Sequence, residues 1–229
     1  MTDELKKYKI IYADPPWNHS DGTGFSYGDK DPRGRSGKHG ISSHSLPYPI
    51  MSVDKIKKLK VGELAEKDSL LFLLTTNRFL EEALKVSRGW GFIPSATLVW
   101  CKPHNQGLFG GAFLSNIEFL IMAKRGSPKI LNKTGSRWFT FPRRKHSEKP
   151  WEIRKIIESI TGGKRVELFA RQKTEGWDVW GNEVESDIKL GGEEDKQECD
   201  CGVDSGVDLE NYPYCPICGK PRPKPGGSL

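Results

Sequence analysis

Residues 8–17 read YKIIYADPPW, and this stretch decides how the fold begins. The apolar run at its start predicts a buried strand over residues 8–13. Two prolines then end the strand, because proline has no N–H for a sheet ladder and the second proline also restricts the backbone of the first. Asp14 should therefore stand at the carboxyl end of the first strand, which is the edge where open α/β sheets place their sites.

Short apolar runs alternate with helical patterns along the rest of the chain, and this alternation predicts an α/β fold. Further strands are expected over residues 69–75, 96–101, 117–123 and 165–170. Helices are expected after an N-cap at Ser52, over residues 79–87, and from Pro150 to the Gly162-Gly163 pair. The last helix has the clearest pattern, because its four isoleucines recur at i, i+3, i+4 and i+7.

Charge divides the chain into a basic body and an acidic end. Residues 183–229 hold 11 acidic and 5 basic residues, so the net charge of +6 combines +12 over residues 1–182 with −6 over the remainder. A basic body suits a polyanionic partner such as nucleic acid, although a basic soluble protein without such a partner fits the same numbers. The chain shows no run of 18 apolar residues and no room for a signal peptide before the first strand, so we expect no membrane span and a cytoplasmic protein.

Residues 14–17 suit chemistry on an aromatic amine. The amino lone pair of adenine is delocalised into the ring and is a poor nucleophile. Acceptors on its two N–H bonds, namely the Asp14 carboxylate and the Pro15 carbonyl, would restore nucleophilicity, while Trp17 would stack on the base. The candidate catalytic residues are therefore Asp14, Pro15, Pro16 and Trp17. A proline-rich turn with a capping aspartate is the alternative interpretation.

Six motifs, taken in their order along the chain, carry a resemblance to a known family. They are ADPPW (13–17), YPIMS (48–52), LVWCK (98–102), HSEKP (146–150), VELFAR (166–171) and GWDVWGNE (176–183). Together they resemble the DPPW-type adenine-N6 methyltransferase family, which includes the catalytic subunit of the eukaryotic mRNA adenosine methyltransferase and many bacterial and phage proteins. The likeness covers about residues 8–184.

The resemblance implies a fold and a cofactor. The fold would be an α/β, Rossmann-like sheet of the S-adenosylmethionine-dependent methyltransferase type, in a permuted order with the catalytic motif first and the cofactor strand near the end. The residues that would border S-adenosylmethionine are Ala13, Asp14, His146, Ser147, Lys149, Glu167, Phe169, Arg171, Asn182 and Glu183. Two physical arguments stand beside the resemblance. The helix N-terminus at Pro150 suits the methionyl carboxylate, and Glu167 suits a ribose hydroxyl.

The resemblance also bears on the substrate. Eukaryotic members often carry His-Asn where this chain has Lys173-Thr174, and Gln where it has Glu183. The 176–183 motif is closer to the bacterial and phage branch. DNA is therefore the expected substrate, with RNA adenosine methylation as the alternative; cytosine-N4 methylation and a non-catalytic nucleic-acid-binding partner also remain open.

A basic segment with interleaved aromatic residues is a candidate nucleic-acid surface. Residues 124–149 hold nine lysines or arginines and one acid, together with Trp138, Phe139 and Phe141. Cations would meet phosphates and rings would stack on bases, and a base in a duplex would have to flip out to reach Asp14. The candidate contacts are Lys102, Lys133, Arg137, Arg143, Arg144 and Lys145. A solvated loop whose aromatics pack on the core is the alternative.

Four of the five cysteines cluster near the end of the chain. Cys199 and Cys201 precede Cys215 and Cys218 by a 13-residue interval. Four thiolates at such spacing can close a tetrahedral Zn²⁺ site, and a segment with so little apolar content would depend on the metal to fold. We therefore expect a methyltransferase domain over residues 1–183, an acidic linker over 184–198 and a zinc-ribbon-like tail over 199–229. A disordered tail with free thiols is the alternative.

Overall fold

The computed structural model describes residues 6–17, 51–103, 116–133, 136–142 and 149–191. All of them belong to the first of the chain's two compact units, Met1–Gly191; the second unit is Gly192–Leu229. The elements follow in chain order: β1 (Tyr8–Ala13), α1 (Val53–Lys58), α2 (Val61–Leu64), β2 (Ala65–Thr75), η2 (Asn77–Phe79), α3 (Leu80–Gly89), β3 (Ile93–Cys101), β4 (Ile117–Arg125), β5 (Trp138–Thr140), α4 (Trp151–Ile160), β6 (Arg165–Leu168) and β7 (Asp178–Trp180). The result is a mixed α/β fold.

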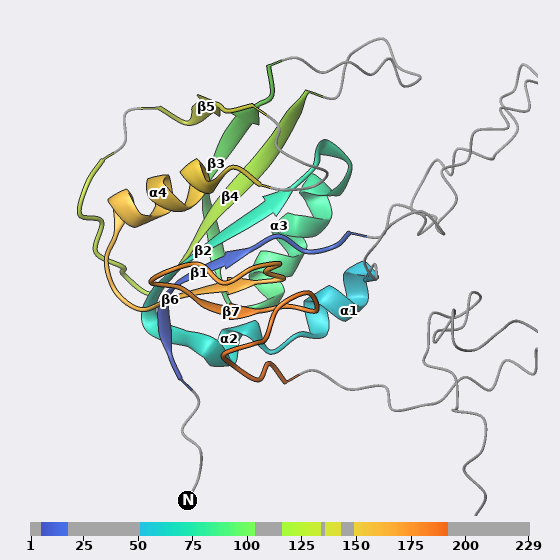
Figure 1. Cartoon of the computed structure of the whole chain (residues 1–229), viewed down its shortest axis with the longest axis vertical. Coiled ribbons are helices and arrows are strands. Elements are labelled where there is room, and N and C mark those ends of the chain that lie inside the picture. Colours follow the sequence, from blue (N-terminus) through green and yellow to red (C-terminus); the bar gives the residue numbers. More distant parts are fainter. Residues whose placement is uncertain (1–5, 18–50, 104–115, 134–135, 143–148, 192–229) are drawn as a thin grey trace, which may run out of the picture. The chain divides into compact units, whose positions relative to one another are not determined.

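The described strands form one sheet of seven strands in the order β5-β3-β4-β2-β1-β6-β7 (Figure 1). β1 lies near its middle and pairs in parallel with both β2 and β6. β4 runs antiparallel to both of its neighbours, β2 and β3. Because β1 and β6 are adjacent and parallel, the segments that follow Ala13 and Leu168 emerge at the same edge of the sheet.

Helices cover both faces of this sheet. Ile11 and Ala13 of β1 pack in a cluster with residues of α1, α2 and α3, whereas Ile10 and Tyr12 pack in a second cluster with α4. The alternation follows from the two-residue period of a strand. In α4, Ile153, Ile157 and Ile160 are buried and Ile156 is partly buried, so the isoleucine stripe faces the sheet as expected. Burying each isoleucine stabilises the fold by about 1.5–3 kcal/mol.

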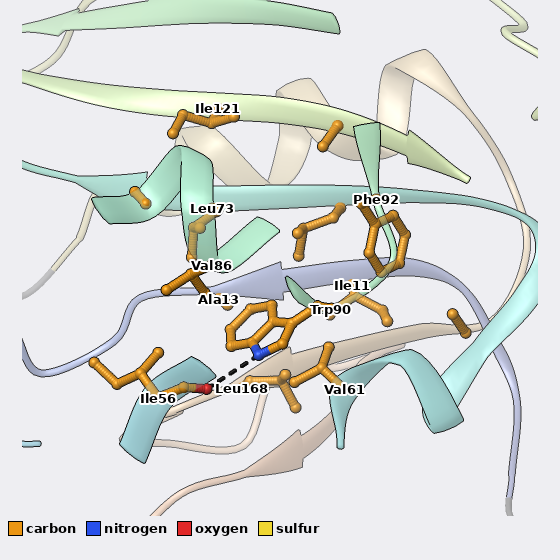
Figure 2. Packing of buried hydrophobic residues seen from close by; sticks show 14 of the residues in the cluster. Ile11, Ala13, Ile56, Val61, Leu73, Val86, Trp90, Phe92, Ile121 and Leu168 are labelled. Atoms are coloured by element: carbon orange, nitrogen blue, oxygen red, sulfur yellow. Dashed lines mark hydrogen bonds between the residues drawn. The ribbon is translucent and has the colours of Figure 1, made fainter. Parts of the chain in front are cut away.

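Trp90 closes the cluster on the α3 side (Figure 2). Its indole is 2 % exposed, and its N–H donates a hydrogen bond of 3.0 Å to the carbonyl of Ile56 at the end of α1. The buried polar atom is thus satisfied while the ring fills the space between α1, α3 and the sheet.

The structure confirms β1 at residues 8–13 and the N-cap at Ser52, whose hydroxyl accepts a bond from the amide of Lys55. Other expected elements differ at their ends. β2 starts four residues earlier than expected, because Ala65 still pairs with Tyr8 of β1, beyond a register shift that separates it from the Ile10–Leu70 pair. β6 stops two residues earlier, because Phe169 turns the chain with a φ of +62°.

Residues 184–191 pack on this same unit. The Asp187 carboxylate accepts a bond of 2.9 Å from the amide of Val179, and the Gly191 carbonyl accepts one of 2.9 Å from the amide of Lys60. Ile188 and Leu190 lie against the cluster on the α3 side. In the part of the chain that the structure describes, no helix is long and apolar enough to cross a membrane.

Candidate active site

The turn that follows β1 is held from both sides. The amide of Trp17 donates to the Pro15 carbonyl at 2.9 Å, and the amide of Met51 donates to the Pro16 carbonyl at 2.9 Å. The bond from Trp17 therefore uses one of the lone pairs of the Pro15 carbonyl, which the sequence predicts to accept from an amine. A carbonyl oxygen has two lone pairs, so one remains for a ligand.

Trp17 lies in the core rather than on a surface. Its side chain is 6 % exposed, its ring stacks on Phe79 with centroids 5.5 Å apart, and its N–H donates to the carbonyl of Leu74 at 3.3 Å. The indole therefore fastens the turn to β2 and η2. Stacking a base on this ring would need exposed ring surface, of which this packing leaves little, and that role stays a prediction.

Asp14 stands at the carboxyl end of β1, with 28 % of its side chain exposed. Its Oδ2 lies 3.5 Å from Nζ of Lys149, the residue before Pro150 at the start of α4. Burial raises the pKa of Asp14 to about 6, against the pull of the Lys149 ammonium, and the Glu118 carboxylate adds to the rise. A carboxylate with a raised pKa is a better proton acceptor than an ordinary aspartate.

Glu118 of β4 extends this arrangement into the sheet. Its Oε2 accepts a bond of 3.1 Å from Nζ of Lys149, and its Oε1 is hydrogen-bonded by Nζ of Lys102. Burial alone raises the pKa of Glu118, but the two ammonium groups outweigh it and the net pKa is lowered. Asp14, Lys149, Glu118 and Lys102 thus form one chain of alternating charges.

Glu167 of β6 is the direct partner of Tyr12, two residues before Asp14, in the β1–β6 pair. It is 6 % exposed, and Arg154 of α4 binds both of its oxygens at 2.7 and 2.8 Å. The hydroxyl of Tyr12 is buried on the same face of the sheet, and within the described residues it has no hydrogen-bond partner. This edge of the sheet therefore holds the Glu167–Arg154 ion pair together with the unpartnered hydroxyl of Tyr12.

The segment after β6 comes close to the segment after β7. Phe169 has a φ of +62° and meets Trp180 edge-on at 5.3 Å between centroids. The amide of Ala170 donates to the Trp180 carbonyl at 2.9 Å, and Nε of Arg171 lies 3.3 Å from Oε1 of Glu183. A bulky residue in the left-handed region is uncommon and marks a constrained turn. The structure thus joins the VELFAR and GWDVWGNE motifs, with Asn182 and Glu183 exposed.

The basic segment divides between surface and core. Lys133 and Arg137 are exposed, and Trp138 on β5 is 63 % exposed. Phe139 and Phe141, by contrast, pack against the cluster beneath α4. Lys102 is 7 % exposed and bonded to Glu118, so it belongs to the Asp14 network and not to an exposed surface.

Several residues singled out from the sequence lie outside the described part of the chain. They are Arg143, Arg144, Lys145, His146, Ser147 and the four clustered cysteines Cys199, Cys201, Cys215 and Cys218. Within the described residues, no group of three or more histidine, cysteine or acidic side chains is placed to hold a metal.

Sequence reasoning missed Glu118, Arg154 and Tyr12. Glu118 had a signal, because it is the one acid in the apolar run over residues 117–123. A buried acid needs a partner, but its partners come from segments about 16 and 31 residues away, and the sequence does not pair them.

Most of the chain is similar in sequence to known proteins. The MT-A70 family model matches residues 8–183. The type II methyltransferase M.MunI of Mycoplasma sp is 33 % identical over 191 residues, which cover 78 % of each chain. The N(6)-adenine-specific methyltransferase METTL4 of Mus musculus is 28 % identical over 200 residues, 78 % of this chain and 38 % of that protein.

A third relative is the N(6)-adenosine-methyltransferase catalytic subunit METTL3 of Homo sapiens, 25 % identical over 192 residues. The match covers 79 % of this chain and 29 % of that protein, so the chain spans well under half of either mammalian relative. The family match takes in the Asp14 turn, Glu118, Lys149 and the segments after β6 and β7. The chain therefore belongs to the MT-A70 family.

Proposed function

We propose that this protein transfers a methyl group from S-adenosylmethionine to N6 of adenine in DNA. The observation that carries the proposal is Asp14, a partly exposed carboxylate with a raised pKa at the carboxyl end of β1, inside the ADPPW motif and the family match. Open α/β sheets place their sites at this edge, and adenine-N6 chemistry needs an acceptor there.

The side chains at this edge do the following work. The Asp14 carboxylate and the free lone pair of the Pro15 carbonyl each accept a hydrogen bond from one N–H of the amine. These two hydrogen bonds turn the lone pair of the amine nitrogen toward the incoming methyl carbon. When bound, the cofactor supplies an electrophilic methyl group on a cationic sulfur. Methyl transfer would form the N–C bond and break the C–S bond, so that the sulfur leaves as a neutral thioether and the nitrogen carries one extra proton. The Asp14 carboxylate would take this proton and pass it to water. A pKa of about 6 suits both halves of this task at neutral pH.

The donor set around the site fits a zwitterionic cofactor that carries a carboxylate, an ammonium and a ribose. Lys149, before the N-terminus of α4, offers a cation for the carboxylate, and Asp14 offers an anion for the positive charge. Glu167 keeps lone pairs for a ribose hydroxyl while Arg154 holds it in place. Ala13, Phe169, Arg171, Asn182 and Glu183 would border the adenosine part, with His146 and Ser147 near the methionine end.

DNA is favoured over RNA by the pattern of similarity. The identity is 33 % to a type II methyltransferase, with 78 % of that protein covered, against 25 % to an adenosine methyltransferase of which 29 % is covered. The exposed Lys133, Arg137 and Trp138 would meet the backbone and an unstacked base, together with Arg143, Arg144 and Lys145. The similarity to a Mycoplasma methyltransferase supports action in the cytoplasm, where the DNA of such cells lies.

The decisive experiment incubates the full chain with labelled S-adenosylmethionine and matched DNA and RNA oligonucleotides. We expect label in DNA, and nucleoside digestion should release N6-methyladenine. Label in RNA alone would replace DNA by RNA as the substrate, and N4-methylcytosine would change the base. Nucleic-acid binding without cofactor binding in calorimetry would show a non-catalytic partner instead.

We also propose that Cys199, Cys201, Cys215 and Cys218 hold a structural Zn²⁺ in a small tail that follows an acidic linker. Their number and spacing support this assignment. Elemental analysis of the purified chain should give about one zinc per protein, and replacing Cys215 and Cys218 by serine should remove it. Zinc retained in that variant would contradict the assignment.

A further inference from the structure

Lys149 lies between two carboxylates that compete for one ammonium group. Its Nζ is 3.1 Å from Oε2 of Glu118 and 3.5 Å from Oδ2 of Asp14, so the shorter contact goes to Glu118. The Lys149 side chain is 20 % exposed, whereas that of Glu118 is 11 % exposed. Because water screens these contacts little, the partition of the ammonium between the two acids has electrostatic consequences.

Glu118 is itself fixed from the sheet side. Lys102 bonds its other oxygen, and the Lys102 ammonium lies 4.8 Å from the centre of the Trp100 ring. Trp100 of β3 and Glu118 of β4 are direct partners in the antiparallel pair. The Glu118 carboxylate is therefore held in place on a β-strand by a second cation, Lys102. A side chain fixed in this way can set the position of the Lys149 ammonium.

From this geometry we propose that Glu118 is a positioning residue: it draws the Lys149 ammonium toward β4 and so prevents Lys149 from pairing fully with Asp14. The inference rests on the proposed function in one respect, because a poorly neutralised Asp14 matters as the acceptor of the amine protons. The geometry alone implies that Glu118 controls the charge state of Asp14.

The direction of that control follows from the groups that face Asp14. They are Lys149 before α4, Glu118 of β4 and Arg171 after β6, while the Tyr12 hydroxyl lies on the same face of β1. Removing the Glu118 charge deletes one neighbouring anion and releases Lys149 toward Asp14. Both changes favour the ionised carboxylate, so they lower the pKa of Asp14 from about 6.

The test is a pH titration of Asp14 by carbon NMR in protein labelled at the aspartate carboxyl carbon, with the resonance assigned from its absence in Asp14→Asn. We expect Glu118→Gln to lower the half-titration pH by roughly one pH unit. Lys149→Met should raise it instead. Glu81→Gln is the matched control, because Glu81 pairs with Lys85 on α3 and is exposed, so it should leave the Asp14 titration unchanged.

A half-titration pH that stays the same or rises in Glu118→Gln overturns the proposal. If that variant does not fold, the double variant Glu118→Gln with Lys102→Met replaces it, because it removes the buried pair together and should show the same fall. The titration needs no methyl transfer. A protein with the expected shifts but no methylation would therefore keep this inference and lose the proposed function, whereas active protein without the shifts would do the reverse.

Discussion

The surroundings of Asp14 partly disfavour the ionised form of its side chain. Burial disfavours its ionised form, and Lys149 makes up only part of the loss because Glu118 shares the same ammonium. A buried charge without full compensation costs folding free energy, and such costs gather at functional sites. The residue that we propose to act on the substrate amine is thus one that the fold would hold more easily in a neutral form.

This leads to a prediction about stability. With a pKa of about 6 in the folded protein and an ordinary value of 3.8 when unfolded, Asp14 binds more protons folded than unfolded between these pH values, so the free energy of unfolding falls as pH rises through that window. Asp14→Asn removes this penalty. It should raise the free energy of unfolding by about 2–3 kcal/mol at pH 7.5 and leave it nearly unchanged at pH 4.

Urea unfolding at the two pH values measures both effects. Asp54→Asn, at the exposed first turn of α1, is the control and should stabilise the protein at neither pH. An Asp14→Asn variant that is less stable than the parent at pH 7.5 would show that Lys149 fully compensates the aspartate.

The sequence predicts some residues of the site and not others. Asp14 was predictable, because two prolines after an apolar run mark a strand end, and Lys149 came through the family resemblance. The pairing of Arg154 with Glu167 was not predictable, because it depends on how α4 crosses the sheet. The burial of Trp17 was also hidden, since an aromatic residue after a turn is compatible with either a ligand surface or the core.

The element that most constrains the proposed cofactor site is the pair of turns after β6 and β7. A Cβ placed on Gly181 would lie 2.1 Å from the Ala170 carbonyl oxygen and 2.8 Å from its nitrogen. Both are backbone atoms that cannot swing away. Glycine at position 181 is therefore what lets the two turns touch, and the φ of +62° at Phe169 belongs to the same close approach.

Gly181→Ala should accordingly push the two turns apart. We expect a loss of about 1–3 kcal/mol in the free energy of unfolding, together with a weaker affinity for S-adenosylmethionine. Thermal melts and calorimetry measure the two quantities. The matched control is Gly162→Ala, whose Cβ would meet a single leucine side-chain atom at 3.6 Å, and it should change neither. Equal behaviour of the two variants would contradict the account of the turns.

Long elements were predictable and short ones were not. The isoleucine stripe of α4 repeats the helical period, and the continuous apolar run of β1 identifies a buried strand. β5 and β7 are three residues each and pair only at the ends of the sheet, so their sequences carry too few repeats. The antiparallel direction of β4 depends on the chain reversal between β3 and β4, which the periodicity of the strands does not encode.

On the scale of the whole molecule, the change of composition near residue 183 and the boundary between compact units do not coincide. The acidic, glycine-rich character begins at about residue 184, yet residues as far as Gly191 bond to and pack on the sheet unit. A high content of charged residues and glycine indicates solvent exposure. A segment such as residues 184–191, in which exposed residues alternate with packed ones, therefore has the same composition as a linker.

Two truncations test where the first unit ends. A chain of residues 1–191 should keep the melting temperature and cofactor affinity that belong to this unit. A chain of residues 1–183 loses the Asp187 hydrogen bonds and the packing of Ile188 and Leu190. Its free energy of unfolding should be about 2–4 kcal/mol lower than that of the 1–191 chain. Equal stability of the two chains would make residues 184–191 a linker after all.

We infer that Asp14 acts on the substrate amine and not mainly on the cofactor. The most direct measurement compares methyl transfer to adenine-containing DNA with S-adenosylmethionine affinity in the parent and in Asp14→Ala. We expect methyl transfer to fall by at least about 10³-fold, as for loss of a group that acts in the transition state, while the cofactor Kd changes by less than about tenfold. Retained methyl transfer, or a loss explained entirely by weaker cofactor binding, would contradict the account.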